Sequence, residues 1–239
     1  MFDFLFSKPH IDWVNKFKRR QEGAHHDFLQ QYYAQGVPHA NTPLNEVEFL
    51  AMDFETTGLS ATTNDIVSIG IVPFTLDSIC LKKSAYWLLR PRVRLSKKSV
   101  TIHGITHNDI IDSPDLTEIA PDLLKQMQNK IVVVHYRNME RNFLNQAFLH
   151  RYKEGIEFPV IDTMQLESII LHRSSLMLIN LLKGNAAKSV RLAQTRQRYH
   201  LPFYTAHHAL CDAVATAELF QAQVAYHFNA DDRISKFWL

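Results

Sequence analysis

Four acidic residues and one histidine stand where their side chains could take part in chemistry. Asp53 and Glu55 lie two apart at the end of the apolar run FLAMDFE, and strand periodicity places both side chains on one face. In the turn sequence TTGL that follows, Gly58 allows a ligand to approach the backbone closely. A paired acid site is one interpretation, and an edge strand with two solvated acids is the other.

Two further acids lie in later segments. Glu140 follows the apolar run IVVVH at the expected start of a helix, where an acid is also common because it complements the helix dipole. Asp212 lies in the apolar segment AHHALCDAVATAELF, where burying an acid is costly unless it is paired or binds a metal. His207 and His208 precede Asp212 by five and four residues, so either imidazole is able to overhang it. A structural histidine is the alternative.

Together these residues have the chemistry of a divalent-metal site. Oxygen ligands in this number suit Mg²⁺ or Mn²⁺, whereas zinc requires cysteine or more histidine. In two-metal hydrolysis one ion activates the attacking water and the other stabilises the leaving oxygen of a phosphodiester. A histidine that titrates near neutrality suits the general base that takes the proton of that water.

The elements that must position these groups follow from the apolar pattern. Three short apolar runs between residues 47 and 91 predict a meander of strands, and a buried strand is predicted over 131–135. Helices are predicted over 116–127, 138–152, 164–171, 176–182, 190–199 and 208–227. Strands first and then β/α alternation predict an α/β fold in which a mixed sheet carries helices on both faces.

Composition limits the class of protein. With 46% apolar and 21% charged residues in 239, disordered and fibrous classes are excluded. Cys80 and Cys211 make neither a disulfide framework nor a zinc motif. No apolar run approaches the roughly 18 residues of a membrane span, and MFDFLFSKPH lacks the basic leader of a secretory signal. We expect a cytoplasmic protein that does not bind membranes.

Three sections of the chain are expected. Residues 1–45 combine aromatic and basic residues at helical spacing with the linker-like stretch GVPHANTP. They predict a short helical N-terminal extension that docks a protein partner or extends a nucleic-acid path. Residues 46–228 are expected to form the main domain. In the tail, 229–239, Phe237, Trp238 and Leu239 are expected to pack back on the domain, with a partner-binding peptide as the alternative.

Five ordered segments resemble the motifs of one family. Residues 49–59, 132–144 and 207–216 (FLAMDFETTGL, VVVHYRNMERNFL and HHALCDAVAT) resemble the three motifs of the DEDDh branch of the DnaQ-like 3′-to-5′ exonucleases. This group includes the proofreading epsilon subunit of bacterial replicative polymerase. TIHGIT at 101–106 resembles the family's HGIT element, and IDT at 161–163 its Asp-Thr before a helix. The resemblance runs from about Val47 to Ala225 and implies an RNase H-like exonuclease fold with a five-stranded sheet.

The resemblance also implies a role for each matching residue. Asp53 would bridge two ions, Mg²⁺ or Mn²⁺, and Glu55 and Asp212 would complete the shell of the first. Glu140 would support the second ion, and His207, at the family's spacing before the last acid, would be the general base. The substrate contacts would be Thr56, Thr57, Gly58, Leu59, His103, Ile105 and Tyr136. The implied activity is release of nucleoside monophosphates from single-stranded or frayed 3′ ends of DNA, in proofreading, repair or end trimming.

The second motif departs from the family pattern in two places. Where the family has His-Asn and then Asp, this chain has His135, Tyr136 and then Glu140. One extra methylene moves a carboxylate by about 1 Å, and a displacement of this size can lower the rate of an enzyme roughly 10²-fold. The departure predicts a slow enzyme or one that prefers Mn²⁺, while Tyr136 is able to stack a base.

Other functions remain as alternatives. One is trimming of RNA 3′ ends, and another is a catalytically weak module that binds nucleic acid or a protein. A haloacid-dehalogenase-type phosphatase fits DFETT poorly, because its motif needs a second Asp. The net charge of +2 is far from that of a nucleic-acid coat protein, so we expect phosphate contacts from the local clusters Arg90–Lys98 and Lys188–Arg198.

Overall fold

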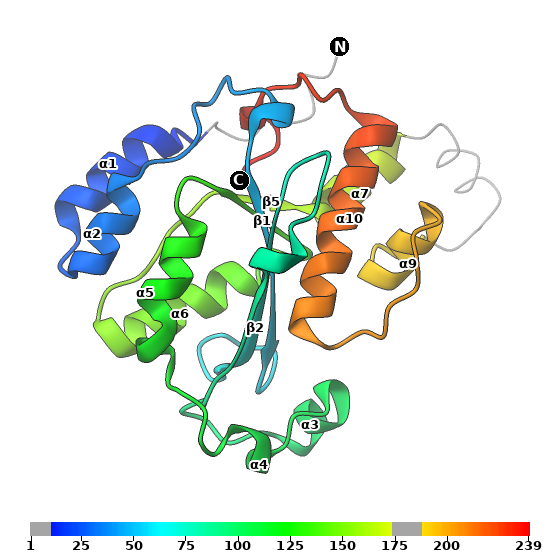
Figure 1. The fold of residues 1–239 in the computed structure, drawn as a ribbon. Helices are drawn as coiled ribbons and strands as arrows, with labels where there is room; N and C mark the ends of the chain where they lie inside the picture. Colours follow the sequence, from blue (N-terminus) through cyan, green and yellow to red (C-terminus); the bar gives the residue numbers. More distant parts are fainter. Residues whose placement is uncertain (1–10, 174–187) are drawn as a thin grey trace.

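The sheet lies at the centre of the molecule. A computed structural model describes residues 11–173 and 188–239, and its five strands have the order β3-β2-β1-β4-β5 (Figure 1). The strands are β1 Phe49–Thr56, β2 Ile66–Phe74, β3 Ala85–Leu88, β4 Ile131–Val134 and β5 Val160–Asp162. Strands β1 to β3 form an antiparallel meander, and β4 and β5 run parallel to β1. The predicted α/β class and mixed five-stranded sheet are confirmed.

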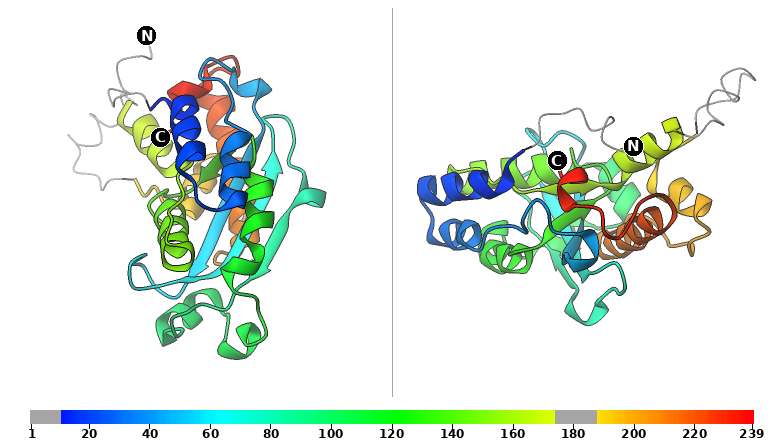
Figure 2. Two further views of the ribbon diagram at one scale, coloured as in Figure 1. Left: turned by 90° about the vertical axis from the view of Figure 1, so that its left-hand side faces the viewer. Right: turned by 90° about the horizontal axis from the view of Figure 1, so that it is seen from above.

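Helices cover both faces of this sheet (Figures 1 and 2). The described helices are α1 Trp13–Gly23, α2 Asp27–Ala34, α3 Lys97–His103, α4 His107–Ile110, α5 Leu116–Met127, α6 Glu140–Tyr152, α7 Thr163–Arg173, α9 Leu192–Arg198 and α10 Ala209–His227. Seen from above in Figure 2, α1 and α2 lie on one side of the sheet and α9 and α10 on the other. No helix in the described ranges is long and apolar enough to cross a bilayer.

The helix predictions agree with the structure to within about two residues at most ends. The predicted helix over 138–152 begins at Glu140, because Tyr136 has φ 90° and a turn over residues 136–139 precedes the helix. The prediction over 176–182 falls outside the described residues. Helices α3 and α4 and strand β5 were not predicted, since segments of 7, 4 and 3 residues are too short for a periodic pattern.

The aromatic residues of α1 and α2 are part of the core of the molecule. Trp13, Phe17, Tyr32 and Tyr33 are each no more than 2% exposed, and their rings pack against one another. Lys16 and Arg20, on the same helix, both pair with Glu157. Apolar packing and two ion pairs therefore attach this N-terminal segment to the rest of the chain.

The last residues of the chain pair with residues 40–44 and with strand β5. The backbone N–H groups of Leu44, Ile234 and Ser235 donate to the carbonyls of Asp232, Thr42 and Ala40 at 3.0, 2.8 and 3.2 Å. The N–H of Leu239 donates to the Val160 carbonyl of the edge strand β5 at 2.9 Å. Phe237 and Trp238 are 3% and 6% exposed, so the predicted packing of these residues is confirmed.

Candidate active site

Strand β1 carries the first two carboxylates into the middle of the sheet. Every residue of β1 is buried except Asp53, which is half-buried, and Asp53 pairs with Gly70 of β2 while Glu55 pairs with Ser68. Side chains two apart on a strand share a face, as the sequence predicted for Asp53 and Glu55. Because neighbouring strands flank β1 on both sides, its position is fixed by the whole sheet.

Gly70 allows the third carboxylate to reach the same place. A Cβ at Gly70 would lie 2.2 Å from the backbone nitrogen of Leu210 and 2.3 Å from the carbonyl carbon of Ala209. The first turn of α10 therefore rests directly on β2, at the residue that pairs with Asp53. This close approach places Asp212, one turn further along α10, beside the strand that holds Asp53 and Glu55.

Glu55, His207 and Asp212 form a compact cluster of donors. One ligand atom from each lies within 4.8 Å of the other two. The backbone N–H of His207 donates to Asp212 Oδ2 at 2.7 Å. The backbone of His207 has φ 71°, a conformation that non-glycine residues rarely adopt. This local turn holds the imidazole at the cluster, five residues before Asp212 as the sequence suggested.

Glu140 enters from another helix and has an unsatisfied oxygen. It is the first residue of α6 and is 2% exposed, and its Oε2 has no hydrogen-bond partner among residues 11–173 and 188–239. A buried carboxylate without a partner is costly. A cation at this position would remove that cost.

The electrostatics of the four carboxylates point the same way. Burial, together with the charges of Glu140, Asp212 and Glu55, raises the pKa of Asp53 well above its usual value. Burial and the charge of Asp212 raise the pKa of Glu55 to about 8. Burial likewise raises the pKa of Glu140 and that of Asp212. Ionising these groups together requires a compensating positive charge, so the residues present fit divalent cations with oxygen ligands.

Asp53, Glu55, Asp212 and His207 line a cavity of about 900 Å³, whereas the buried Glu140 does not. Of the predicted substrate residues, four line it: Thr56, Gly58, Leu59 and His103. The Leu59 side chain is 82% exposed at this opening. The His103 Nδ1 accepts from the Ile105 N–H at 3.0 Å, and burial lowers the pKa of His103, so its Nε2 carries the proton of a neutral ring.

The other three predicted contacts do not line this cavity. Thr57 is 2% exposed, and its Oγ1 donates to Asn64 and accepts from the Asp65 N–H, which closes the turn after β1. Ile105 packs against a small apolar cluster. Tyr136 is 44% exposed and donates its backbone N–H to Asp162. The structure gives Thr57 a structural contact in place of a position on the cavity wall.

His135 lines the cavity although sequence reasoning gave it no role. Its two ring nitrogens lie 2.9 Å from Thr163 Oγ1 and 3.0 Å from the Val190 carbonyl, and burial lowers its pKa to about 4. A neutral His135 thus joins β4 to the segment that leads into α9. The signal was present as the histidine that ends the apolar run IVVVH.

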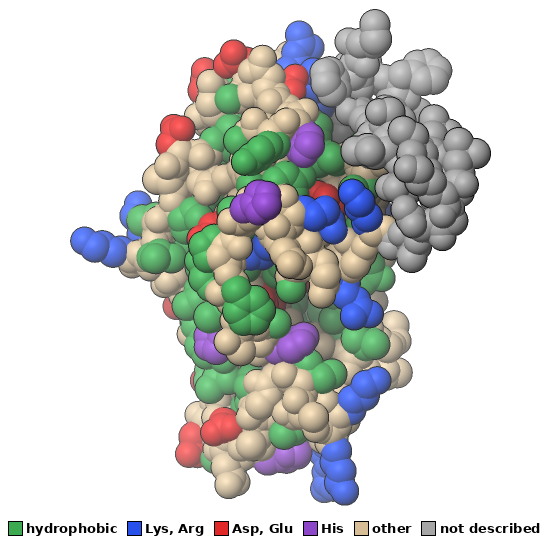
Figure 3. Space-filling model, turned by 90° about the vertical axis from the view of Figure 1, so that its right-hand side faces the viewer, with side chains coloured by type: hydrophobic (Ala, Val, Ile, Leu, Met, Phe, Trp, Pro, Cys, Tyr) green, Lys and Arg blue, Asp and Glu red, His purple; other side chains and the backbone are tan. Residues whose placement is uncertain are grey.

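Much of the predicted phosphate-binding cluster over 188–198 is paired internally, so that expectation was wrong for two of its arginines. Arg198 binds the Glu167 carboxylate at 2.9 Å. Arg196 is 4% exposed and binds Glu218 at 2.7 Å. Lys98 and Arg191 line the cavity and have no ion-pair partner among the described residues. Figure 3 shows Lys and Arg side chains following one another down one margin of this face.

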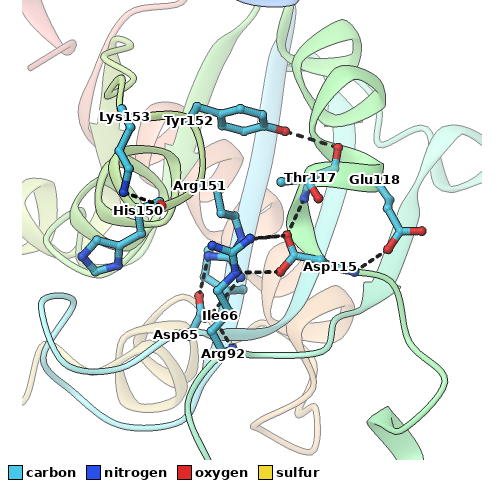
Figure 4. A network of polar contacts seen from close by, with 10 residues as sticks. All are labelled: Asp65, Ile66, Arg92, Asp115, Thr117, Glu118, His150, Arg151, Tyr152 and Lys153. Atoms are coloured by element: carbon cyan, nitrogen blue, oxygen red, sulfur yellow. Dashed lines mark hydrogen bonds and ion pairs between the residues drawn. The ribbon is translucent and has the colours of Figure 1, made fainter.

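A buried ion-pair network supports the turn after β1 from behind (Figure 4). Arg151, near the end of α6, binds Asp65 at 2.8 Å and Asp115 at 2.9 Å, with its side chain 2% exposed. The carboxylate of Asp65 also accepts the backbone N–H of Arg92 at 2.9 Å. The network joins the turn with Gly58 to the segment that leads into α3. Sequence reasoning missed it, because Arg151 lies 86 residues from Asp65.

Comparison with known proteins gives a match over most of this region. A family model described as RNase_T, Exonuclease, matches residues 50–220. DNA polymerase III subunit epsilon of Treponema pallidum is 28% identical over 181 residues, which are 76% of this chain and 78% of that protein. The PolC-type DNA polymerase III of Oceanobacillus iheyensis is 31% identical over 140 residues, 57% of this chain but 10% of the polymerase. The chain thus spans only a small part of the PolC-type relatives.

Solved structures share the fold. Cell-death related nuclease 4 has a TM-score of 0.63 at 18% identity, with 79% of this chain and 67% of that chain covered. The nuclease domain of 3′hExo, a DEDDh family member bound to rAMP, has a TM-score of 0.61 at 12% identity, with 83% and 98% covered. Exonuclease X in complex with 5′ overhanging duplex DNA has 0.53 at 20% identity, with 79% and 98% covered. At these identities the likeness shows a common fold.

Proposed function

Since this chain belongs to the RNase_T exonuclease family and carries a domain of the DEDDh 3′-to-5′ type, we propose that it releases nucleoside monophosphates from the 3′ ends of DNA. The observation that supports this best is that Asp53, Glu55 and Asp212 line one cavity with His207, while the charge of the buried Glu140 acts on Asp53. The proposed DNA substrate rests on relatives that are named as a PolC-type DNA polymerase III and as the epsilon subunit of DNA polymerase III.

The proposed cofactor is a pair of divalent cations, Mg²⁺ or Mn²⁺. Bound to the carboxylates, they would neutralise the phosphodiester and acidify the attacking water. Asp53 would take part in holding both ions, and Glu55 and Asp212 would complete the ligands of one of them. Glu140 would hold the other through the oxygen that lacks a partner.

The remaining steps belong to side chains of the cavity. His207 would accept the proton of the attacking water, because its ring lies with Glu55 and Asp212 in one cluster. Leu59 would pack against the terminal base, and the neutral His103 would offer its Nε2–H as a donor. Thr56 and Gly58 would let the terminal nucleotide approach the backbone.

The activity is tested with 5′-labelled single-stranded DNA and its RNA counterpart, in Mg²⁺, Mn²⁺ or EDTA. We expect a metal-dependent ladder that shortens from the 3′ end. Asp53→Asn should abolish it, whereas Glu22→Ala, which removes an exposed acid of α1, should not. Intact oligonucleotides in both metals would contradict the proposal and favour a catalytically weak binding module.

RNA trimming is the second candidate. The observation in its favour is that two neighbours in fold act on or bind RNA components by their descriptions: an exonuclease that recognises a histone mRNA stem-loop, and 3′hExo bound to rAMP. The ratio of DNA to RNA cleavage rates in the same assay decides between the two substrates.

The cellular setting is also proposed. Proofreading, repair or end trimming in the compartment that holds the DNA fits relatives named as polymerase subunits. The unpaired cysteines Cys80 and Cys211 fit a reducing environment. In the described part of the N-terminal extension, a protein partner would contact the exposed basic side, Lys18 and Arg19, because Trp13, Phe17, Tyr32 and Tyr33 are buried.

A further inference from the structure

A second cavity opens beside the first. It has a volume of about 610 Å³ and lies between α9, the loop over residues 200–207 and the start of α10. The two cavities share the lining residues Leu192, Ala193, Gln194, Ala206 and Asp212. They therefore meet at one of the carboxylates proposed to hold a cation.

The wall of the second cavity carries an aromatic ring in an unusual position. Phe203 is 86% exposed, the largest exposure of any large apolar side chain among the described residues. The only comparable one is Leu59, at 82%, which belongs to the first cavity. An exposed phenyl ring at the edge of a cavity offers a flat apolar surface to a ligand.

The rest of that wall mixes apolar residues, such as Leu192 and Pro202, with a few polar ones, and apart from Asp212 it holds little free charge. Arg196 is neutralised inside the wall: it binds Glu218, donates to the carbonyls of Ala215 and Pro202 at 2.6 and 2.9 Å, and lies 4.7 Å from the ring centre of Tyr204. Gln194 and Gln197 are exposed, and their side-chain amides have no hydrogen-bond partner among the described residues. An aromatic ring with two free amides suits a flat, uncharged ligand with donors and acceptors on its edge. A nucleobase has these properties.

The position of the second cavity indicates which nucleotide of the substrate contributes this base. In the proposed reaction the scissile phosphate lies at the carboxylates, and the terminal nucleotide occupies the larger cavity beside Leu59. The nucleotide on the 5′ side of that phosphate must leave on another side of the carboxylates, and the second cavity opens there, at Asp212. We propose that this cavity binds the base of the penultimate nucleotide, with Phe203 stacked on it and Gln194 and Gln197 at its edge. This inference rests on the proposed function.

The loop that carries Phe203 is held in place at both ends. His200 and His207 have φ values of 55° and 71°, and the Tyr204 hydroxyl donates to Glu218 Oε1 at 2.8 Å. The ring of Phe203 is thus presented by a loop fixed to α9 and α10. A base that is paired in a duplex is already stacked and hydrogen-bonded, and removing it costs a few kcal/mol. The subsite therefore favours 3′ ends in which the last two nucleotides are unpaired.

The test combines a change in the protein with a change in the substrate. Phe203→Ala and Phe203→Tyr are compared with the unaltered protein on two single-stranded DNA oligonucleotides, one normal and one with an abasic penultimate residue. We expect Phe203→Ala to lower kcat/KM on the normal oligonucleotide by about 5- to 100-fold, and to have almost no effect on the abasic one. Phe203→Tyr should retain the activity, because it keeps the ring.

Two controls separate the subsite from general damage. The p-nitrophenyl ester of thymidine 5′-monophosphate has no penultimate base, so Phe203→Ala should hydrolyse it at the unaltered rate. Tyr226→Ala removes an aromatic side chain that is 69% exposed on α10 but does not line the cavity, and it should change neither oligonucleotide.

The outcomes distinguish this inference from the proposed function. Equal losses on the normal and abasic oligonucleotides, or no loss on either, would overturn the subsite while the enzyme stays active. If the unaltered protein cleaves nothing, the proposed function fails. The dissociation constants of the same protein and oligonucleotide pairs, measured by fluorescence anisotropy, then test the subsite alone. A Phe203→Ala effect that disappears with the abasic residue would still support it.

Discussion

The two sides of the site are built in opposite ways. The carboxylate wall, meaning β1 with α10, rests on apolar contacts: the Phe49 ring stacks on that of Phe74, with ring centres 5.2 Å apart, and packs edge-on against Phe220 of α10. The α9 wall, meaning α9 with the loop over 200–207, buries only polar residues of its helix, Thr195 and Arg196. Ion pairs to Glu167 and Glu218 hold that wall in place.

The two walls should therefore respond differently to changes in pH, in salt and in charged side chains. Apolar packing and backbone contact do not depend on pH or salt, so the distances between the carboxylates are fixed by shape. A helix held by charged contacts loses stability when one partner is removed or protonated. Shape therefore governs the metal side, and charge governs the side proposed to hold the substrate strand.

The largest expected effect comes from Gly70→Ala, which disturbs the packing of the carboxylate wall without changing any charge. The new Cβ would meet the backbone of Ala209 and Leu210 at 2.2 to 2.5 Å, so α10 must move away from β2. We expect kcat to fall by about 10²-fold, because a displacement of about 1 Å has that cost. Kinetics on the labelled oligonucleotide measure the loss, and Gly23→Ala, where a Cβ has no neighbour within 4 Å, is the control. Full activity in Gly70→Ala would mean that contact with β2 does not set the position of Asp212.

A smaller effect is expected from Arg196→Met, which removes one of the ion pairs that hold the α9 wall in place. It removes the Arg196 donor from Glu218, which keeps only the Tyr204 hydroxyl, and from the carbonyls of Ala215 and Pro202. We expect the free energy of local opening of α9 to fall by about 2 kcal/mol, with KM raised and kcat little changed. Hydrogen exchange of the α9 amides measures the opening. Arg191→Met, at the exposed start of the same helix, should leave exchange unchanged, and equal exchange in both variants would show that the ion pair does not hold the wall.

The smallest effect concerns the carboxylates themselves. Because the pKa of Glu55 is raised to about 8 in the fold, the metal-free folded state holds a proton that the unfolded chain has lost above about pH 4.5. The stability that Glu55 contributes therefore falls as pH rises from about 4.5 to 8. We expect Glu55→Gln to raise the Tm in EDTA at pH 8 by a few degrees and to change it little at pH 4.

The Tm of the unaltered protein must be compared with that of Glu55→Gln at each pH, because the contribution of His135 to stability changes with pH in the opposite direction. Its pKa is lowered to about 4, so its contribution to stability rises with pH up to about 6.5. Adding Mg²⁺ at pH 8 should stabilise the unaltered protein more than Glu55→Gln. Parallel Tm curves for the two proteins would show that Glu55 is ionised without a metal.

The carboxylate wall could be predicted from the sequence, whereas for the α9 wall only the helix could be predicted and its contacts could not. Asp53 and Glu55 end an apolar run, and Asp212 interrupts one, so local pattern alone predicted their elements. Gly70 looked like any strand residue, since its importance comes from the backbone of α10, which is remote in sequence.

The errors fell where charge pairs with distant charge. Arg196 and Arg198 looked like free cations, because their partners Glu218 and Glu167 lie 22 and 31 residues away. No local pattern distinguishes a paired arginine from a phosphate ligand. Phe203 and Tyr204 were missed because a loop has no periodicity that would mark an exposed ring as unusual.

The hydrogen bonds between residues 40–44 and 232–235 form only after both segments have been synthesised. They join segments about 190 residues apart, and long separations of this kind slow folding, because a large loop must close first. Helix α10, which covers β1 and β2 and supplies Asp212, is translated after every strand. While the ribosome is still making it, the sheet has one uncovered apolar face, a state open to aggregation and to chaperones. The nascent chain thus lacks Asp212, and with it the complete set of carboxylates, until α10 has been synthesised.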